Sequence, residues 1–191
     1  AATYSVPIDL PKGSGGVTPP LSLSYSSSGG NRWLGVGWNL GGMSAVSRCR
    51  PSKIHDGRAM PVTMSAKDRF CLDGQRLILV SGTYGSPDSV YKKEQDDFSK
   101  ITARGGSAGH PDYFEVDAKD GSFTRYGNSG TANSVDSEQG GWNGSAEGGQ
   151  TIQWAIDEFR DNVGNKIDYR YSYDANGFRP SFIYYAFTNP N

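Results

Sequence analysis

Residues 151–174 are TIQWAIDEFRDNVGNKIDYRYSYD, and their alternation decides the fold class. In the first half Ile152, Trp154 and Ile156 share one face of an extended strand, because successive side chains of a strand point to opposite sides. In the second half every second residue is again apolar or aromatic: Ile167, Tyr169, Tyr171 and Tyr173. Between the halves, residues 161–165 are rich in Asp, Asn and Gly, which favour turns. The stretch therefore predicts a β-hairpin with one buried face.

Two further hairpins are predicted upstream of this stretch. In RFCLDGQRLILV (69–80), Asp73 and Gly74 stand between two apolar runs, and Asp-Gly suits a two-residue turn whose central residues both need positive φ. In YFEVDAKDGSFTRYG (113–127), Asp-Gly recurs between alternating segments, with Phe114 and Val116 on one face. Local turns therefore connect neighbouring antiparallel strands.

The N-terminal region adds an amphipathic strand and an extended segment. Leu21, Leu23 and Tyr25 alternate with serines, which is the pattern of a strand with one buried face. Residues 6–20 contain four prolines, which cannot donate to a β-ladder and confine this segment to a sheet edge or an extended wrap. With 26 glycines and 10 prolines in 191 residues, the chain is predicted to be all-β, built of hairpin-rich antiparallel sheets.

Composition argues against several functions. The formal net charge is -1 with both signs scattered along the chain, so no basic stripe is available for nucleic acid. No apolar run approaches the roughly 20 residues that cross a bilayer, and the first residues lack the features of a signal peptide. We therefore expect no nucleic-acid partner and no membrane span.

No catalytic, metal or cofactor motif is recognisable. His55 and His110 lie in turn-rich stretches outside any metal or nucleophile motif, so we interpret both as surface-loop residues. Paired carboxylates such as Asp157 and Glu158 are expected to be solvated charges, and the spacing of a calcium loop is missing. The prediction is a chain that is not an enzyme and that has no catalytic residue, metal or cofactor.

Cysteines and tryptophans leave alternatives open. Cys49 and Cys71 either pair in an oxidising compartment or are two buried thiols on neighbouring strands. Trp142 lies in a polar loop at about residues 127–150, where it either anchors the loop or meets a ligand. Trp38 is flanked by Gly35 and Gly37, which favours packing in the core, whereas the alternative is an exposed platform with Trp33 that stacks against a sugar. Tyr184 and Tyr185 similarly either stack within a sheet or form a binding surface.

The combined order of motifs resembles a known family. Residues 4–48, YSVPIDLPKGSGGVTPPLSLSYSSSGGNRWLGVGWNLGGMSAVSR, resemble the opening of the N-terminal domain of SpvB-type virulence proteins, which also begins the B component of bacterial toxin complexes. Next come the hairpin with Asp73 and Gly74, then VYKKEQDDFSKI and KDGSFTRYG, in that family's order. The match covers nearly the whole chain.

The last part resembles the start of Rhs, or YD, repeats. In FRDNVGNKIDYRYSYDANG (159–177), an Asp-x-x-Gly-Asn turn precedes the pattern made by Tyr171, Tyr173, Asp174 and Gly177. The resemblance divides the chain into an SpvB-like β domain at 1–150 and the start of Rhs-like hairpins at 151–191. It implies the opening segment of a β-shell that is partly open at its C-terminal edge.

In function, the resemblance implies a non-catalytic structural segment of a secreted, extracellular bacterial toxin whose shell encloses and delivers a toxic C-terminal payload. Its partner would be the remainder of its own longer chain or a toxin-complex subunit. The Glu-x-Glu signature of SpvB-type ADP-ribosyltransferases, the aspartate-based Rhs autoprotease core and the toxin-complex propeller are absent from these residues, so the resemblance implies no enzymatic activity here. The alternative is a free-standing extracellular binding module, with a glycan as the possible ligand.

Overall fold

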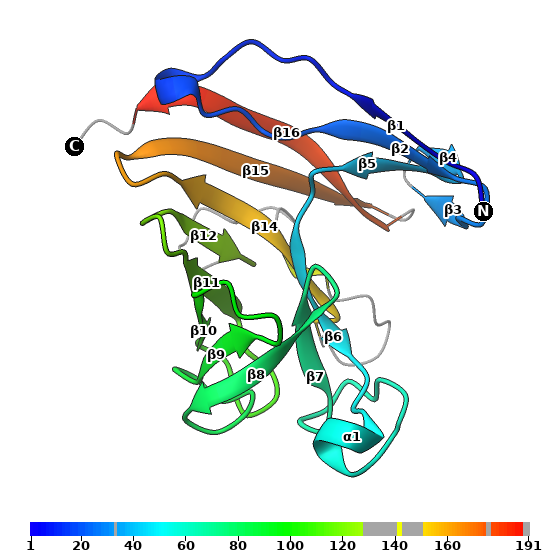
Figure 1. Ribbon diagram of the computed structural model, residues 1–191, viewed down its shortest axis with the longest axis vertical. Coiled ribbons are helices and arrows are strands. Elements are labelled where there is room, and N and C mark those ends of the chain that lie inside the picture. Colours follow the sequence, from blue (N-terminus) through cyan, green and yellow to red (C-terminus); the bar gives the residue numbers. More distant parts are fainter. Residues whose placement is uncertain (33, 128–140, 143–150, 175–176, 189–191) are drawn as a thin grey trace.

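The computed structural model describes residues 1–32, 34–127, 141–142, 151–174 and 177–188, and these residues form mostly β-strands (Figure 1). The helical elements are a 3-10 turn, η1 (Ser14–Gly16), and one short helix, α1 (Lys53–Asp56). The strands are β1 (Thr3–Pro7), β2 (Ser22–Ser26), β3 (Asn31–Arg32), β4 (Gly35–Val36), β5 (Trp38–Gly41), β6 (Ala45–Cys49), β7 (Arg69–Leu72), β8 (Gln75–Ser81), β9 (Val90–Lys93), β10 (Lys100–Arg104), β11 (Tyr113–Asp117), β12 (Phe123–Tyr126), β13 (Gly141–Trp142), β14 (Gln153–Arg160), β15 (Asn165–Asp174) and β16 (Gly177–Thr188). The prediction of an all-β, hairpin-rich fold is confirmed.

Eight of these strands close into an antiparallel barrel. The sheet runs in the order β12, β11, β10, β9, β8, β7, β6 and β14, and β14 pairs with β12 to complete the ring. The first half of β14 pairs with β6, where Gln153 faces Ser47, and its second half pairs with β12, where Arg160 faces Phe123. The strand β14 therefore closes the barrel.

The same strand leads into a long two-stranded ribbon. Arg160 of β14 also pairs with Lys166 of β15, and β16 pairs with β15 and ends the sheet. Figure 1 shows β15 and β16 extending past the barrel as one twisted hairpin. All three strands β14, β15 and β16 follow the predicted domain boundary in the sequence. However, β14 pairs with β6 and β12, which precede that boundary, so the sheet spans it. The division at residues 150 and 151 stays a prediction.

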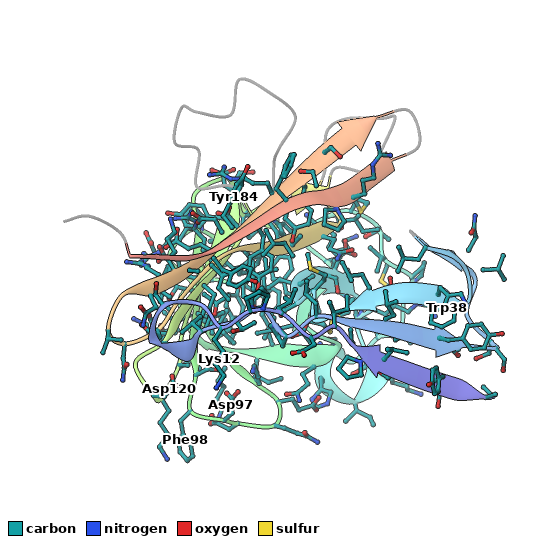
Figure 2. The ribbon with its side chains drawn as sticks, turned by 90° about the horizontal axis from the view of Figure 1, so that it is seen from above. Lys12, Trp38, Asp97, Phe98, Asp120 and Tyr184 are labelled. Atoms are coloured by element: carbon teal, nitrogen blue, oxygen red, sulfur yellow. A yellow bond between two sulfur atoms is a disulfide. The ribbon has the colours of Figure 1, made fainter. Side chains whose placement is uncertain are left out.

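A separate small sheet is formed by the N-terminal strands. It has the order β1, β2 and β5, while β3 and β4 form a two-stranded pair. Figure 2 shows this sheet projecting to one side of the molecule, with Trp38 in its outer part. The sheet thus stands beside the barrel and does not belong to its wall.

The predicted hairpin turns are present. Leu72 pairs with Gln75 across Asp73 and Gly74, whose φ values are 49° and 80°. A positive φ at both central residues is the geometry that matches the twist of the flanking strands. The Asp120 hairpin joins β11 to β12, and the segment 161–164 joins β14 to β15. The two-residue turn with positive φ at both positions is found at Asp73 and Gly74, whereas residues 118–122 form a longer loop in which Gly121 has the positive φ, 83°.

The barrel interior holds the hydrophobic core. Trp154 is fully buried, and the edges of the Phe70 and Phe114 rings meet its indole, with ring centroids 5.5 Å and 5.1 Å away. The other fully or nearly fully buried apolar residues are Val46, Leu72, Leu77, Tyr91, Ile101, Ala103, Val116, Tyr126, Ala155, Ile156, Ile167, Tyr169 and Tyr171. The predicted faces of the hairpin at 151–174 supply five of these buried residues, counting Trp154, and Ile152 is half-buried.

The proline-rich segment forms both structures predicted for it, an edge strand and an extended wrap. The strand β1 lies at the edge of the small sheet, and the chain then passes to β16, where η1 packs. A Cβ atom on Gly13 would lie 3.1 Å from the Tyr185 ring, and one on Gly15 would lie 2.2 Å from Nδ2 of Asn165. This wrap covers one end of the ribbon.

Candidate functional site

The C-terminal ribbon carries the predicted tyrosines in two different environments. Tyr171 is buried and its hydroxyl donates to the backbone oxygen of Ile156 at 2.7 Å. Tyr184 is 49% exposed and stacks on Phe182, which is 57% exposed, with ring centroids 6.0 Å apart. Tyr185 points to the opposite face and packs, half-buried, against the barrel core. Of the two candidate binding tyrosines, Tyr184 is therefore the surface residue.

The repeat-like motif spans the far end of the ribbon. Asp174 pairs with Gly177, and Tyr173 pairs with Phe178, in the register of β15 and β16. The side chains of Tyr173 and Asp174 lie outside the described residues, as does the dipeptide 175–176. The backbone pairing is thus a hairpin, as the motif predicts.

The predicted tryptophan sites are only partly described. Trp33 and most of the loop at 127–150 lie outside the described residues, and of Trp142 only the backbone is described, where it pairs with Gln153. Trp38 is half-buried and packs against Tyr25, with ring centroids 5.2 Å apart, outside the barrel core. This location differs from the expected core packing, because β5 belongs to the projecting sheet.

Gly37 permits a close approach beside Trp38. Its φ is 79°, and a Cβ atom there would lie 2.6 Å from the Tyr25 ring and 2.8 Å from the Ser26 backbone oxygen. Two residues before Gly37, Gly35 begins β4 with a φ of 104°. Only glycine accommodates both the positive φ and this contact.

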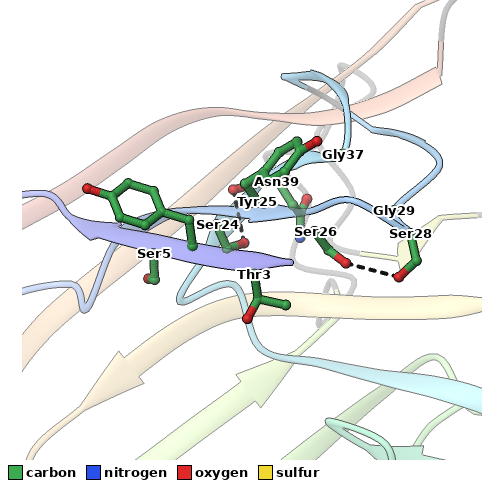
Figure 3. Close-up of a pocket in the computed structure, with 10 residues that line it drawn as sticks. Thr3, Ser5, Ser24, Tyr25, Ser26, Ser28, Gly29, Gly37 and Asn39 are labelled. Carbon is green, nitrogen blue, oxygen red and sulfur yellow. Dashed lines mark hydrogen bonds between the residues drawn. The ribbon is translucent and has the colours of Figure 1, made fainter. Parts of the chain in front are cut away.

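A hollow lined by hydroxyl groups lies on the small sheet (Figure 3). Its volume is about 630 Å³, and none of its lining residues carries a charge: Thr3, Tyr4, Ser5, Ser24, Tyr25, Ser26, Ser28, Gly29, Gly37 and Asn39. Ser26 and Ser28 lie within hydrogen-bond distance at 3.2 Å, and the Ser24 hydroxyl donates to the Asn39 backbone oxygen at 3.3 Å. Hydroxyl and amide groups of this kind can exchange hydrogen bonds with a neutral polar ligand.

A charged network on β14 was not expected from the sequence. Arg125 donates to Asp157 at 2.6 Å and lies 3.0 Å from Glu158, although these two carboxylates are consecutive. The register shifts at this point, so that Asp157 is the extra residue of a β-bulge and both acids face Arg125. Arg160 and Lys166 complete the network at 2.7 Å and 3.4 Å from Glu158.

Burial makes this network different from the solvated charges that we predicted. Glu158 is only 5% exposed, so the expectation for Asp157 and Glu158 was wrong. Burial lowers the pKa of Arg125, but the charges of Asp157 and Glu158 outweigh it and raise that pKa above its ordinary value. Burial raises the pKa of Asp157, and the neighbouring Arg125 opposes this rise. Through these contacts the network joins β12, β14 and β15.

A second buried charge closes one end of the barrel. The Arg48 side chain is 0% exposed, lies 3.4 Å from Asp68, and sits over the Phe70 and Trp154 rings. Its guanidinium also donates to the backbone oxygens of Ser65, Gly109 and Thr151 at 3.3, 2.8 and 2.7 Å. The signal was available in the sequence, because Arg48 shares a strand face with Val46 and so had to point inward.

His110 belongs to the same cluster. Its Nδ1 atom lies 3.2 Å from Nη2 of Arg48 and the residue is half-buried, so this loop histidine has a contact with a buried charge that the sequence did not indicate. His55 is in α1 with an exposed side chain and lies 2.9 Å from Glu94. The backbone N–H of His55 donates to the Ser52 hydroxyl at 3.2 Å as the N-cap of α1. Neither imidazole ring contacts a serine or cysteine side chain in the hydrogen bonds of the described residues.

The two cysteines are joined in a disulfide. Cys49 in β6 and Cys71 in β7 are bonded, with Cα atoms 5.9 Å apart. Of the two alternatives, paired cysteines or two buried thiols, the structure has the pair. It fixes two adjacent strands of the barrel wall.

The described residues show neither a metal cluster nor a long apolar helix. No three His, Cys, Asp or Glu side chains among them are grouped so as to hold a metal ion. No helix in the described part of the chain has the length and apolar character that a membrane crossing requires. The candidate functional surfaces are therefore the exposed ribbon and the hollow on the small sheet.

Several solved structures share this fold, among them the following three. The N-terminal domain of the effector protein SpvB from Salmonella typhimurium strain LT2 matches with a TM-score of 0.71 and 21% identity, covering 98% of this chain and 65% of that one. The TcdB2-TccC3-Cdc42 structure matches with a TM-score of 0.69 and 19% identity, covering 96% of this chain and 9% of that one. The Photorhabdus luminescens Tc holotoxin pore matches with a TM-score of 0.68 and 19% identity, covering 96% of this chain and 9% of that one.

These comparisons define how far the similarity extends. The chain spans about two thirds of the SpvB domain structure and about a tenth of the toxin-complex chains. No individual curated protein matches the sequence. The sequence profile described as Salmonella virulence plasmid 65kDa B protein, SpvB, matches residues 1–181, and the chain therefore belongs to the SpvB family.

Proposed function

We propose that this chain is a non-catalytic structural segment of a secreted bacterial toxin. In this role it forms the opening part of a β-shell that encloses a toxic C-terminal payload and delivers it. Membership of the SpvB family over residues 1–181 supports the proposal, as does the fold shared with the TcdB2-TccC3 structures. The disulfide supports an extracellular location, because such bonds persist in oxidising environments.

The open edge of β16 is the observation that carries this proposal. Within the described residues β16 pairs only with β15, so its other edge has no partner strand. On this strand the Phe182 side chain is more than half exposed and the Tyr184 side chain nearly half exposed. A twelve-residue edge strand with exposed aromatic groups is a template for another strand. In a larger shell the next hairpin would occupy that edge, so the partner would be the rest of a longer chain or a toxin-complex subunit.

The length of the native gene product tests the proposal. Its intact mass in the source cells is to be compared with the 20.6 kDa of this chain. We expect a much larger product that continues into further Tyr-Asp repeats. A product that ends near Asn191 would contradict the proposal, because no further strand would then exist to extend the sheet.

Association of the isolated chain gives a second test. We expect light scattering after gel filtration to show self-association through the β16 edge, and Tyr184→Lys to reduce it, because a charge on an edge strand opposes pairing. Val80→Lys is the matched control, since Val80 is 59% exposed in the barrel strand β8. A monomer at every concentration would count against an accessible edge.

Carbohydrate binding is the second candidate function. The uncharged hollow supports it, because hydroxyl and amide groups line it together with Tyr4 and Tyr25. A glycan screen with the wild-type chain tests this function, with Tyr25→Ala for the hollow and Trp33→Ala and Trp142→Ala for the predicted tryptophan sites. A hit that Tyr25→Ala abolishes would assign the hollow, and a blank screen would exclude this function.

A further inference from the structure

His110 occupies a position at the end of the barrel where only its neutral form fits. Nη2 of Arg48 lies 3.2 Å from Nδ1 of His110. A guanidinium group has five N–H donors and no acceptor, so Nδ1 must be the acceptor. The ring is then neutral and carries its proton on Nε2. Protonation would remove this hydrogen bond and place two positive charges side by side.

The surrounding charges do not favour a second cation here. The charged groups that face His110 are Arg48, from β6, and Asp68, from the segment before β7. Asp68 already accepts from the backbone N–H groups of Thr63 at 2.8 Å and Ser65 at 3.1 Å, besides its pair with Arg48. Asp112, two residues along the loop from His110, is exposed. Burial first and the Arg48 charge second lower the pKa of His110, and the opposing effect of Asp68 is smaller.

The loop that contains His110 is held by contacts that depend on this arrangement. The Gly109 backbone oxygen accepts from Arg48 at 2.8 Å, and its N–H donates to the Gly85 oxygen at 3.0 Å. The backbone oxygen of Pro111, which follows His110, accepts from Nε1 of the buried Trp154 at 3.1 Å. Residues 105–112 therefore cover the barrel end and touch the centre of its core through Arg48 and Trp154.

We propose that His110, Arg48 and Asp68 form an acid-sensitive latch, in which protonation of His110 releases residues 105–112 from the barrel end while the rest of the barrel stays folded. The released segment takes with it the Gly109 backbone oxygen that accepts from Arg48 and the Pro111 oxygen that accepts from Trp154, while Asp68, Ser65 and Thr151 remain as partners of Arg48. The opening is local, because the eight-stranded ring and the disulfide between β6 and β7 do not depend on His110.

The direction of the pH effect follows from linkage. A histidine whose pKa is lowered in the folded state binds fewer protons there than in the open state. The latch is fully closed above the ordinary pKa of 6.5 and weakens as the pH falls from 6.5 through the lowered value. One proton changes the opening equilibrium by at most about tenfold per pH unit.

Hydrogen exchange at pH 7.5 and pH 5.0 tests the latch, with each rate divided by the intrinsic chemical rate at that pH. We expect peptides covering residues 105–112 to lose protection at pH 5.0, by at most about tenfold for each pH unit below 6.5, while peptides from β9 and β10 keep theirs. Loss of protection everywhere, or at no site, would overturn the proposal. In His110→Asn the Oδ1 atom replaces Nδ1 as acceptor without titrating, and the loss at 105–112 should disappear.

The other histidine offers a matched control. Nε2 of His55 lies 2.9 Å from Oε1 of Glu94. The variant His55→Gln keeps a polar side-chain amide at this position and removes the second titrating ring. We expect this variant to keep the wild-type pH response at 105–112. If the response is lost in His55→Gln or retained in His110→Asn, the assignment to His110 is wrong.

A direct titration does not require any variant to fold. The sequence contains two histidines, so two imidazole signals are expected in the NMR spectrum of the wild-type chain. We expect the signal of His110 to titrate below 6.5, together with shifts in the amides of residues 105–112. A titration midpoint at or above 6.5 would show that the folded state binds the proton at least as well as the open state, and it would exclude the latch.

Discussion

The barrel and the projecting small sheet are built from similar sequence patterns but reach different degrees of burial. Strand β2 alternates leucine and tyrosine with serine as regularly as β14 alternates Trp154 and Ile156 with its neighbours, yet every residue of β2 is only half-buried. In β1, Tyr4 remains 65% exposed, whereas Trp154 is fully buried. Alternation therefore defines an apolar face, but closure of a sheet and a second layer are needed to bury it.

Trp154→Ala should have the largest effect, because it removes the centre of the barrel core. Loss of the indole leaves a cavity between Phe70 and Phe114, and an unpaired acceptor at Pro111. We expect a loss of about 3–5 kcal/mol in the free energy of unfolding, measured by urea denaturation. A loss below about 1 kcal/mol would mean that the barrel is not the main source of stability.

Removal of the disulfide should come next. The bond closes a loop of 22 residues, and cross-linking a loop of this length stabilises a fold by about 3 kcal/mol through the unfolded chain. Cys49→Ala combined with Cys71→Ala should therefore lower the melting temperature of the barrel, and a reductant should have the same effect on the wild-type chain. The double variant is the control, because its melting temperature should not respond to reductant.

Alkaline pH should reveal the buried tyrosines of the hydrophobic core, such as Tyr169 in β15. Burial raises the pKa of Tyr169 to about 12 from its ordinary value of 10.0. A raised folded-state pKa gives stability that is complete below pH 10 and is lost as the pH rises from 10 through 12, at most about 3 kcal/mol for a rise of about two pKa units. The loss should be smaller in Tyr169→Phe, as measured by unfolding at pH 9 and pH 11. An unchanged loss would show that other groups cause the alkaline transition.

Trp38→Ala should have the smallest effect and would sharpen the comparison most. Trp38 packs on Tyr25 in the projecting sheet, so we expect a loss of about 1 kcal/mol or less, without a shift in the cooperative unfolding of the barrel. Trp38→Phe, which keeps an aromatic contact with Tyr25, serves as the control. A large shift of the barrel transition in Trp38→Ala would mean that the two regions fold as one unit.

Local features of the fold were predictable from the sequence because they depend on neighbouring residues. Asp73 and Gly74 specify a turn, and the alternation around Trp154 and Tyr169 specifies a buried face. The closure of the barrel was not predictable, because Gln153 pairs with Ser47 and periodicity does not encode such distant partners. The result is a closed ring where only hairpins were expected.

The candidate sites were predictable only in part, for a related reason. Tyr184 is exposed and its binding role stays a prediction, whereas Tyr185 faces the core because it occupies the alternate position of the strand. The bulge at Asp157 and the contact between Arg48 and His110 depend on strand register and on loops that meet in space. Only the inward direction of Arg48 could have been inferred from alternation.

The closing role of β14 has a consequence for the order of synthesis. On a ribosome β6 is complete about a hundred residues before the part of β14 that pairs with it is made, so the nascent sheet must wait with one edge of β6 unpaired. During this interval the strands from β6 to β12 can form hairpins in sequence, since each pairs with the next. The final step joins the two ends of this nascent sheet, and any delay in translation before residue 160 prolongs the period in which both ends remain available to other chains.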